Sequence, residues 1–231
     1  MTAFAGKNQL EKLFGDGKTE AVARIIKKAA PDSRRLLVVG CGSGLEAAIL
    51  SQELMIEVVG IDLRGNFDPR VASLVQLRKG DATHLDFEDR SFDIVYSYHA
   101  LEHIPDYRQA LAEMHRVLTD TGTYFIGTPN RDRLVGYIGS KTATLRNKIQ
   151  WNISDWRARV QGRFRNELGA HAGFSSAELH NELAGVFTEV EEITLIYYLT
   201  IYSGHKRFIR FLSKTGLGRF LFPSVYFIGM K

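Results

Sequence analysis

The stretch that decides the fold is Leu36-Leu37-Val38-Val39-Gly40-Cys41-Gly42-Ser43-Gly44. Four apolar residues, a glycine-rich loop and then an Ala/Leu/Glu-rich stretch over 45–54 predict a buried strand, a tight turn and a helix. Glycines let the backbone of such a loop approach a ligand closely, and the helix N-terminus offers unpaired N–H groups to a negative group. The loop alone is a weak motif, because its G-x-G-x-G spacing differs from the dinucleotide-binding G-x-G-x-x-G.

Further apolar runs alternate with helical patterns along the first 130 residues. Runs at 57–61, 74–77, 92–96 and 123–126 predict strands, and apolar residues at helical spacing over 107–118 predict a helix. Strands buried on both faces read as continuous apolar runs rather than alternating ones. The pattern therefore predicts an α/β, Rossmann-like fold, with a mostly parallel sheet and helices on both faces.

The pattern changes after the fifth run. Residues 131–172 contain no convincing strand, hold nine basic against three acidic residues, and include Trp151 and Trp156. We expect one domain over 1–231, with 131–172 forming a basic, mostly helical lid over the site. The lid hypothesis assigns recognition of an acidic or phosphate group in the acceptor to Arg157, Arg159, Arg163 or Arg165. A solvated basic face is the alternative.

Regular structure is expected again towards the C-terminus. Ser175-Ser176-Ala177-Glu178 is a capping-box pattern before a short helix. Residues 187–202 are interpreted as a long strand, or as two strands with a bulge, and 224–229 as the last strand.

Residues 205–222 hold five basic residues and no acid, interleaved with apolar side chains. This pattern predicts either peripheral membrane contact through 204–222 or a solvated helix packed on the sheet.

Acidic residues follow two of the predicted strands. Asp62 comes 18 residues after Gly44, about where an acid meets ribose hydroxyls, and Asp81 follows the third strand. Ligands of parallel sheets bind at the carboxyl ends of the strands. The first strand is thus followed by the glycine-rich loop, and the second and third strands are each followed by an acidic residue. Together these three groups predict a nucleotide-like ligand site, although each group taken alone is equally typical of a turn.

These residues together resemble the class I S-adenosylmethionine-dependent methyltransferases, of the type 11 small-molecule kind. The resemblance covers 34–130 closely and 171–186 loosely, and it implies a seven-stranded sheet with an antiparallel last strand. It is carried by Val39-Gly40-Cys41-Gly42-Ser43-Gly44, Gly60-Ile61-Asp62, Gly80-Asp81-Ala82, Ser91-Phe92-Asp93-Ile94-Val95, Leu101-Glu102-His103-Ile104-Pro105-Asp106, and Arg116-Val117-Leu118 through Thr128-Pro129-Asn130.

The resemblance implies S-adenosyl-L-methionine as cofactor. Asp62 would take both ribose hydroxyls, and Asp81 would accept from the adenine amino group. The glycine-rich loop would hold the methionine end. The cofactor-binding residues implied in this way are Gly40, Cys41, Gly42, Gly44, Asp62, Leu63, Asp81, Ala82 and Ser97.

One position departs from the family pattern. The acid that usually stands two residues before the first glycine, and helps to hold the amino group of the cofactor, is replaced by Val38. A backbone carbonyl near Tyr96 or Ser97 is the expected substitute.

The segment His99-Ala100-Leu101-Glu102-His103 follows the fourth predicted strand. Its letters match a zinc-peptidase pattern, but its position after a strand argues against a protease. Some related O-methyltransferases carry Glu-x-x-Glu-His here and bind a divalent metal, whereas this chain has His99 in place of the first Glu. We favour a structural turn without a metal. His99 and His103 are the predicted catalytic bases, with His171 as a third candidate.

Composition limits the remaining choices. One Cys in 231 residues excludes a disulfide scaffold, and no apolar run approaches the length of a membrane span. The first residues hold no apolar signal-peptide core, so a cytoplasmic protein is expected. The uneven charge argues against a nucleic-acid partner.

The predicted function is methyl transfer to a small molecule, sugar or lipid-linked acceptor, at oxygen, with an anionic acceptor favoured by the basic insertion. A nicotinamide-dependent oxidoreductase and an inactive cofactor-binding or membrane-associated module are the alternatives. The glycine spacing argues against the oxidoreductase, and Val38 is the best support for the inactive module.

Overall fold

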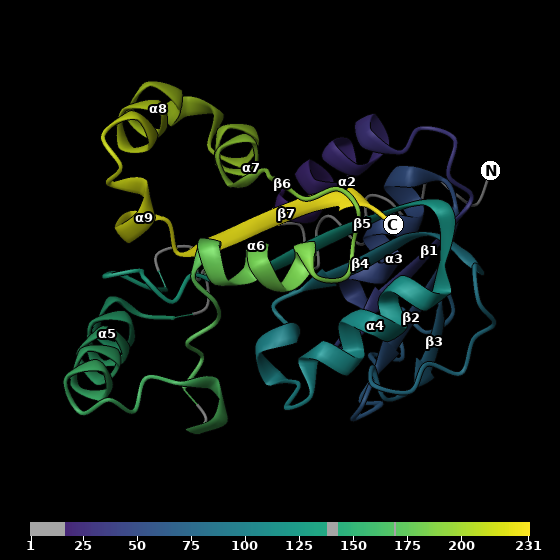
Figure 1. Cartoon of the computed structure of the whole chain (residues 1–231), viewed down its shortest axis with the longest axis horizontal. Helices are drawn as coiled ribbons and strands as arrows, with labels where there is room; N and C mark the ends of the chain where they lie inside the picture. Colours follow the sequence, from purple (N-terminus) through teal and green to yellow (C-terminus); the bar gives the residue numbers. More distant parts are fainter. Residues whose placement is uncertain (1–16, 138–142, 169) are drawn as a thin grey trace.

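A mostly parallel sheet runs through the centre of the computed structural model, which describes residues 17–137, 143–168 and 170–231 (Figure 1). In the described residues the strand order is β3-β2-β1-β4-β5-β7-β6. The strands are β1 (Arg35–Val39), β2 (Glu57–Asp62), β3 (Gln76–Lys79), β4 (Phe92–Tyr98), β5 (Leu118–Pro129), β6 (Glu191–Glu192) and β7 (Ser224–Met230).

The direction of the strands agrees with the expected topology. β1 pairs in parallel with β2 and β4, β2 with β3, and β4 with β5. β7 runs antiparallel to both of its neighbours, β5 and β6. The Rossmann-like, seven-stranded sheet with an antiparallel last strand is therefore confirmed, and the carboxyl ends of β1 to β5 meet at one edge.

Helices cover both faces of the sheet (Figure 1). One face packs against α2 (Lys18–Ala29), α3 (Leu45–Leu54) and α7 (Thr194–Ile201). The opposite face packs against α4 (Tyr107–Val117) and α6 (Ser176–Ala184). Both faces of β1 are buried, which explains why its sequence is a continuous apolar run rather than an alternating one.

The remaining elements lie mostly beyond the carboxyl edge. α5 (Leu145–Val160) and the 3-10 segment η2 (Asn166–Leu168) belong to the insertion. The segment η1 (Leu101–His103) follows β4. Near the C-terminus lie η3 (Ser203–His205), α8 (Lys206–Lys214) and α9 (Gly218–Leu221). In Figure 1, α5, α8 and α9 gather at one end of the long axis.

The predicted helix start at Ser175 is confirmed. The Ser175 hydroxyl accepts a hydrogen bond from the Glu178 backbone N–H, and the Glu178 carboxylate accepts one from the Ser175 N–H. This capping box satisfies two backbone donors that the first turn of α6 leaves unpaired.

The predicted strand over 187–202 is wrong. Pairing with β7 covers only Glu191 and Glu192, and α7 follows. An apolar run of this length fits a buried helix as well as a strand, and periodicity cannot separate the two. Tyr197 and Tyr198 decide the outcome by packing on Tyr226.

The third predicted strand begins two residues later than expected, because Leu74 and Val75 lie in the turn before β3. Residues 1–16, on which the signal-peptide prediction rests, lie outside the described residues. Within the described part of the chain, none of the helices has both the length and the apolar character that crossing a membrane requires.

Candidate active site

The glycine-rich loop is fixed by its neighbours at the carboxyl edge. The backbone N–H groups of Gly40 and Cys41 both donate to the Ile61 carbonyl of β2, at 2.9 Å. Gly40 has φ +76°, and a side chain there would collide with Ala100, in the segment after β4. Gly44 has φ +88°, and a side chain there would collide with Leu77 of β3. Only glycine therefore lets the loop lie this close to its neighbours.

Gly42 occupies the open side of the same loop. It has φ +54°, and no atom lies within 4 Å of the point where its Cβ would stand. Its N–H donates to Oδ2 of Asp62 at 3.0 Å. The loop thus exposes backbone without side chains next to the N-terminus of α3. A helix N-terminus favours a negative group.

Asp62 is held rigidly at the end of β2. Its Oδ2 atom accepts from Gly42 N–H, and its Oδ1 atom accepts from Arg64 N–H at 2.9 Å. Each carboxylate oxygen can accept more than one hydrogen bond, and the residue is half-buried. The carboxylate is therefore oriented in advance for a pair of donors such as a ribose diol.

Asp81 is exposed at the end of β3. Its Oδ1 atom accepts from the Thr83 N–H at 2.9 Å and from the Thr83 hydroxyl at 2.8 Å. These hydrogen bonds to the charged form, led by the backbone N–H, lower the pKa of Asp81, so it is a charged acceptor at neutral pH. Ala82, next to it, is half-buried, and Leu63 after Asp62 is exposed.

Two further residues complete this edge. Ser97 lies at the end of β4, paired with Val39 of β1, and its buried hydroxyl has no hydrogen-bond partner within the described residues. Cys41 is buried, and desolvation followed by the charge of Asp62 raises the pKa of its thiol to about 12. Cys41 therefore stays protonated and is no nucleophile at neutral pH. The open face at Gly42 and the unpartnered Ser97 hydroxyl fit a bound cofactor at this edge.

His99, Glu102 and His103 form a cluster after β4. The side chain of Glu102 is only 1% exposed, and its Oε1 atom lies 3.8 Å from His99 Nδ1 and 3.9 Å from His103 Nε2. These distances allow an electrostatic effect but exceed hydrogen-bond length. His99 also lies 3.2 Å, Nε2 to Oγ, from Ser224 at the start of β7.

Burial shifts the pKa values of this cluster in opposite directions. Desolvation raises the pKa of Glu102 to about 7, and its Oε2 atom has no partner among the described residues. Desolvation, with a smaller effect of the Arg133 charge, lowers the pKa of His99 to about 3. Desolvation also lowers the pKa of His103. Both imidazoles are therefore neutral near pH 7, whereas Glu102 changes its charge there.

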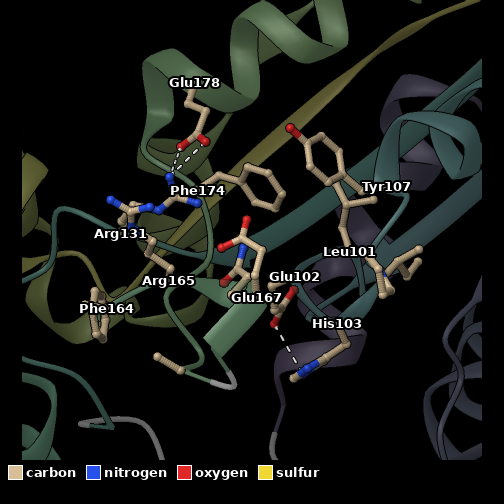
Figure 2. A pocket seen from close by; sticks show the side chains of 14 residues that line it. Leu101, Glu102, His103, Tyr107, Arg131, Phe164, Arg165, Glu167, Phe174 and Glu178 are labelled. Atoms are coloured by element: carbon tan, nitrogen blue, oxygen red, sulfur yellow. Dashed lines mark hydrogen bonds and ion pairs between the residues drawn. The ribbon is translucent and has the colours of Figure 1, made fainter. Parts of the chain in front are cut away.

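Two cavities border Glu102 and His103. The first, of about 830 Å³, lies between the segment after β4 and the insertion, which contributes Phe164, Arg165 and Glu167 (Figure 2). The second, of about 390 Å³, is lined by His99, His171, Lys18, Arg133 and six tyrosines. The tyrosines are Tyr98, Tyr137, Tyr197, Tyr198, Tyr202 and Tyr226.

Residues 37–126 match the family described as "Methyltransferase domain". The chain is 38% identical over 89 residues to the demethylmenaquinone methyltransferase of Lactiplantibacillus plantarum, over 34% of this chain and 38% of that protein. It is 42% identical over 96 residues to the enzyme of the same name from Staphylococcus aureus, over 38% and 40% of the two chains. The chain contains a class I, S-adenosylmethionine-dependent methyltransferase domain.

The solved structures agree on the fold of this domain. Phosphoethanolamine N-methyltransferase 2 of Haemonchus contortus, in complex with S-adenosyl-L-methionine, superposes with a TM-score of 0.58 at 20% identity, over 96% of this chain and 55% of that one. The sequence matches are shorter, and the chain spans about two fifths of the length of the curated relatives named above. The family match, over residues 37–126, ends before the insertion.

The structure places the expected residues of the methyltransferase domain at one edge. The glycine loop follows β1, Asp62 is the last residue of β2, and Asp81 follows β3. Ser97 is the last but one residue of the neighbouring strand β4. His99 and His103 are brought together around Glu102, and the ring centroid of His171 lies 4.7 Å from that of His103. No group of three or more metal-ligating side chains is found within the described residues.

The four arginines of the lid hypothesis lie in different environments. Arg165 lines the larger cavity. Arg159 donates to the Arg133 carbonyl at 2.8 Å and lies over the Phe164 ring. Arg163 is exposed and donates to the Gln161 side chain at 2.6 Å, and Arg157 is exposed on α5.

Sequence reasoning missed Arg133, which organises the insertion. Its side chain is 4% exposed, donates to three backbone carbonyls and pairs with Asp155 at 3.3 Å. No sequence pattern distinguished Arg133 from the other arginines of residues 131–172. The cluster of tyrosines that lines the smaller cavity was also missed. Tyr197 and Tyr198 fell in the stretch interpreted as a strand, and neighbouring residues of a strand point to opposite faces.

Proposed function

We propose that the chain transfers the methyl group of S-adenosyl-L-methionine to an oxygen atom of a small, ring-containing acceptor. One observation carries the proposal. The edge with the glycine loop, Asp62 and Asp81 continues, on the neighbouring strand β4, into the cluster of His99, Glu102 and His103. Cofactor-binding and proton-accepting groups therefore lie side by side at one edge of the sheet.

The cofactor side of this proposal uses carboxylates and bare backbone. Asp62 would accept from the two ribose hydroxyls, and Asp81 would accept from the adenine amino group. Gly40, Cys41, Gly42 and Gly44 would hold the methionine end, with the α3 N-terminus favouring its carboxylate. The sulfonium cofactor supplies an already activated methyl group, so the protein mainly has to align the acceptor and exclude water.

The acceptor is proposed to lie in the tyrosine-lined cavity. Tyr197 stacks on Tyr226 with ring centroids 3.5 Å apart, and the hydroxyls of Tyr98 and Tyr197 lie 3.0 Å apart. Such walls offer apolar faces with a few polar atoms, which suits an aromatic compound with a hydroxyl group. The relatives named demethylmenaquinone methyltransferases act, by their name, on a quinone, which supports a ring-containing acceptor.

A hydroxyl acceptor must lose its proton to react well. His99 borders the tyrosine-lined cavity and is neutral, so its ring has a lone pair for that proton, and His103 is the second base. The pKa of about 3 makes His99 a weak base on its own, so its role depends on the negative charge of Glu102. Ionised Glu102, within 4 Å of both rings, stabilises the imidazolium that forms. Ser224 holds the other side of the His99 ring and orients it.

An acceptor screen tests this function. Cofactor labelled at the methyl group is incubated with the chain and with pools of phenols, quinols, sugars and lipids. We expect acceptor-dependent release of S-adenosylhomocysteine with the phenol or quinol pool, reduced by His99→Ala at unchanged cofactor affinity. Cofactor binding without methyl transfer in any pool would support the inactive module, and transfer to sugars or lipids alone would contradict the ring-containing acceptor.

A further inference from the structure

The end of the molecule beyond the carboxyl edge exposes large apolar side chains. Phe208 and Phe211 of α8 are 60% and 54% exposed, and Trp151 and Trp156 of α5 are 42% and 47% exposed. We call this surface the apolar-basic end. Its exposed apolar residues are Leu134, Leu145, Ile149, Trp151, Ile153, Trp156, Val160, Phe208, Phe211, Leu217 and Phe220.

Hydrogen bonds join the parts of this surface. The Leu134 N–H donates to the Phe220 carbonyl of α9 at 2.8 Å, and the indole N–H of Trp156 donates to the Leu134 carbonyl at 2.7 Å. α9 in turn packs against α8. Helices far apart in the sequence therefore lie at one end of the long axis (Figure 1), and each carries exposed apolar side chains.

Basic residues accompany the apolar ones. Residues 204–222 contain no acid. Lys206, Arg207, Arg210 and Lys214 are all exposed, and within the described ranges none of the four forms an ion pair. Four positive charges on one nine-residue helix are thus left to attract an anionic partner from solution.

The α8 helix places its side chains in three sectors. Ile209 and Leu212 are buried against the protein. At 100° per residue, Phe208 and Phe211 lie beside that buried sector, and the basic residues occupy the remaining side. Aromatic side chains bordered by Lys and Arg are typical of a helix that lies in a membrane interface.

We propose that the apolar-basic end docks on the surface of an anionic lipid membrane. The aromatics insert among the headgroups, and the unpaired cations of α8 contact acidic lipids. Charge complementarity between the cations of α8 and acidic headgroups, together with aromatic side chains beside those cations, favours an anionic lipid surface over a protein partner. This proposal stands on the surface alone and does not require the proposed methyl acceptor.

Vesicle sedimentation tests the docking without cofactor or acceptor. The full chain is mixed with vesicles of phosphatidylcholine alone, or of phosphatidylcholine with about a third phosphatidylglycerol. We expect binding to the anionic vesicles only. Each surface cation contributes about fivefold to such binding, so Arg207→Gln with Arg210→Gln should weaken it by more than tenfold.

Matched variants separate docking from general charge attraction. Phe208→Ser with Phe211→Ser should weaken binding at least tenfold, whereas Met55→Ser, at an even more exposed apolar residue of another face, should not. Lys27→Gln with Lys28→Gln removes two exposed charges from α2 and should leave binding nearly unchanged. Equal losses from the α2 and α8 pairs, no binding to anionic vesicles, or a dimer in solution that the phenylalanine variant dissociates would overturn the proposal.

Discussion

Two regions of the molecule are held in place by different means. At the carboxyl edge of β1 to β3, the glycine loop is fixed by backbone hydrogen bonds to Ile61 and by close packing that only glycine permits. In the insertion, single side chains fix the backbone. Arg133 donates to three carbonyls, and Asn152 forms hydrogen bonds with both backbone groups of Gly136.

The difference bears on how each region specifies its ligand. A loop shaped by its backbone presents the same N–H groups whatever its other side chains are, which suits one invariant cofactor. A region held by side chains can change its lining when a few residues change, which suits the varied acceptors of methyltransferases. We therefore expect substitutions in the two regions to separate cofactor affinity from acceptor affinity.

Asp62 offers the largest effect on the cofactor side. Asp62→Ala removes the carboxylate proposed to accept two charge-assisted hydrogen bonds from the ribose, and it should weaken binding of S-adenosylmethionine by about 2–4 kcal/mol. Calorimetric titration measures the loss. Asp32→Ala, at an exposed carboxylate before β1, is the control and should bind like the parent. Equal affinity in the two variants would show that the ribose does not lie at Asp62.

Glu102 lies where the two regions meet. Its pKa of about 7 in the folded chain exceeds the ordinary value of 4.5, so the folded state binds its proton more tightly than the unfolded state. The free energy of unfolding should therefore fall as pH rises from 4.5 through 7, by on the order of 3 kcal/mol. Glu102→Gln should abolish this decline, because the amide does not ionise.

Chemical denaturation at pH 5 and pH 8 measures the effect. Glu88→Gln, at an exposed carboxylate, should leave the difference between the two pH values as in the parent. The rate of methyl transfer should rise through about pH 7 in the parent, as Glu102 ionises, and lose this rise in Glu102→Gln. A parent whose stability is equal at both pH values would mean that Glu102 has an ordinary pKa.

Arg165 tests the acceptor side. The larger cavity shares Glu102 and His103 with the tyrosine-lined cavity proposed for the acceptor ring. If an anionic group of the acceptor extends into the larger cavity, Arg165→Gln removes a cation from its wall and should raise the acceptor KM about tenfold, with cofactor affinity unchanged. Arg163 is also exposed but does not line that cavity, so Arg163→Gln is the matched control. A KM that neither substitution changes would leave the lid hypothesis without support.

The smallest effect is expected at Ser175. Ser175→Ala removes the capping box of α6 and should lower the free energy of unfolding by about 1 kcal/mol. Ser203→Ala, at an exposed residue outside such a cap, should change stability little. Because Ser175 lies outside both ligand regions, cofactor affinity and acceptor KM should not change. A change in either would show that α6 shapes the site.

Much of the sheet could be predicted because each buried parallel strand is a continuous apolar run. The run at 36–39 and the glycines after it defined the first strand and its loop, and α3 has the predicted bounds. Asp62 and Asp81 could be placed because the carboxyl ends of parallel strands share one edge. Periodicity failed at α7, whose Tyr197 and Tyr198 are both buried by packing on β7.

The acceptor side could not be predicted, because it depends on contacts between distant segments. The environment of Glu102 arises from β4, β7 and the insertion together, and no local pattern reveals that its carboxylate is buried. Arg133 likewise resembles its basic neighbours until the fold brings the carbonyls of residues 171 and 172 to it.

The central claim is that this edge of the sheet binds S-adenosylmethionine through Asp62 and the glycine loop. Calorimetric titration of the full chain with S-adenosylmethionine, S-adenosylhomocysteine and NAD tests it most directly. We predict saturable binding of the two sulfur-containing ligands, no heat with NAD, and loss of binding in Asp62→Ala. Tight binding of NAD, or binding of S-adenosylmethionine that Asp62→Ala leaves intact, would contradict the account.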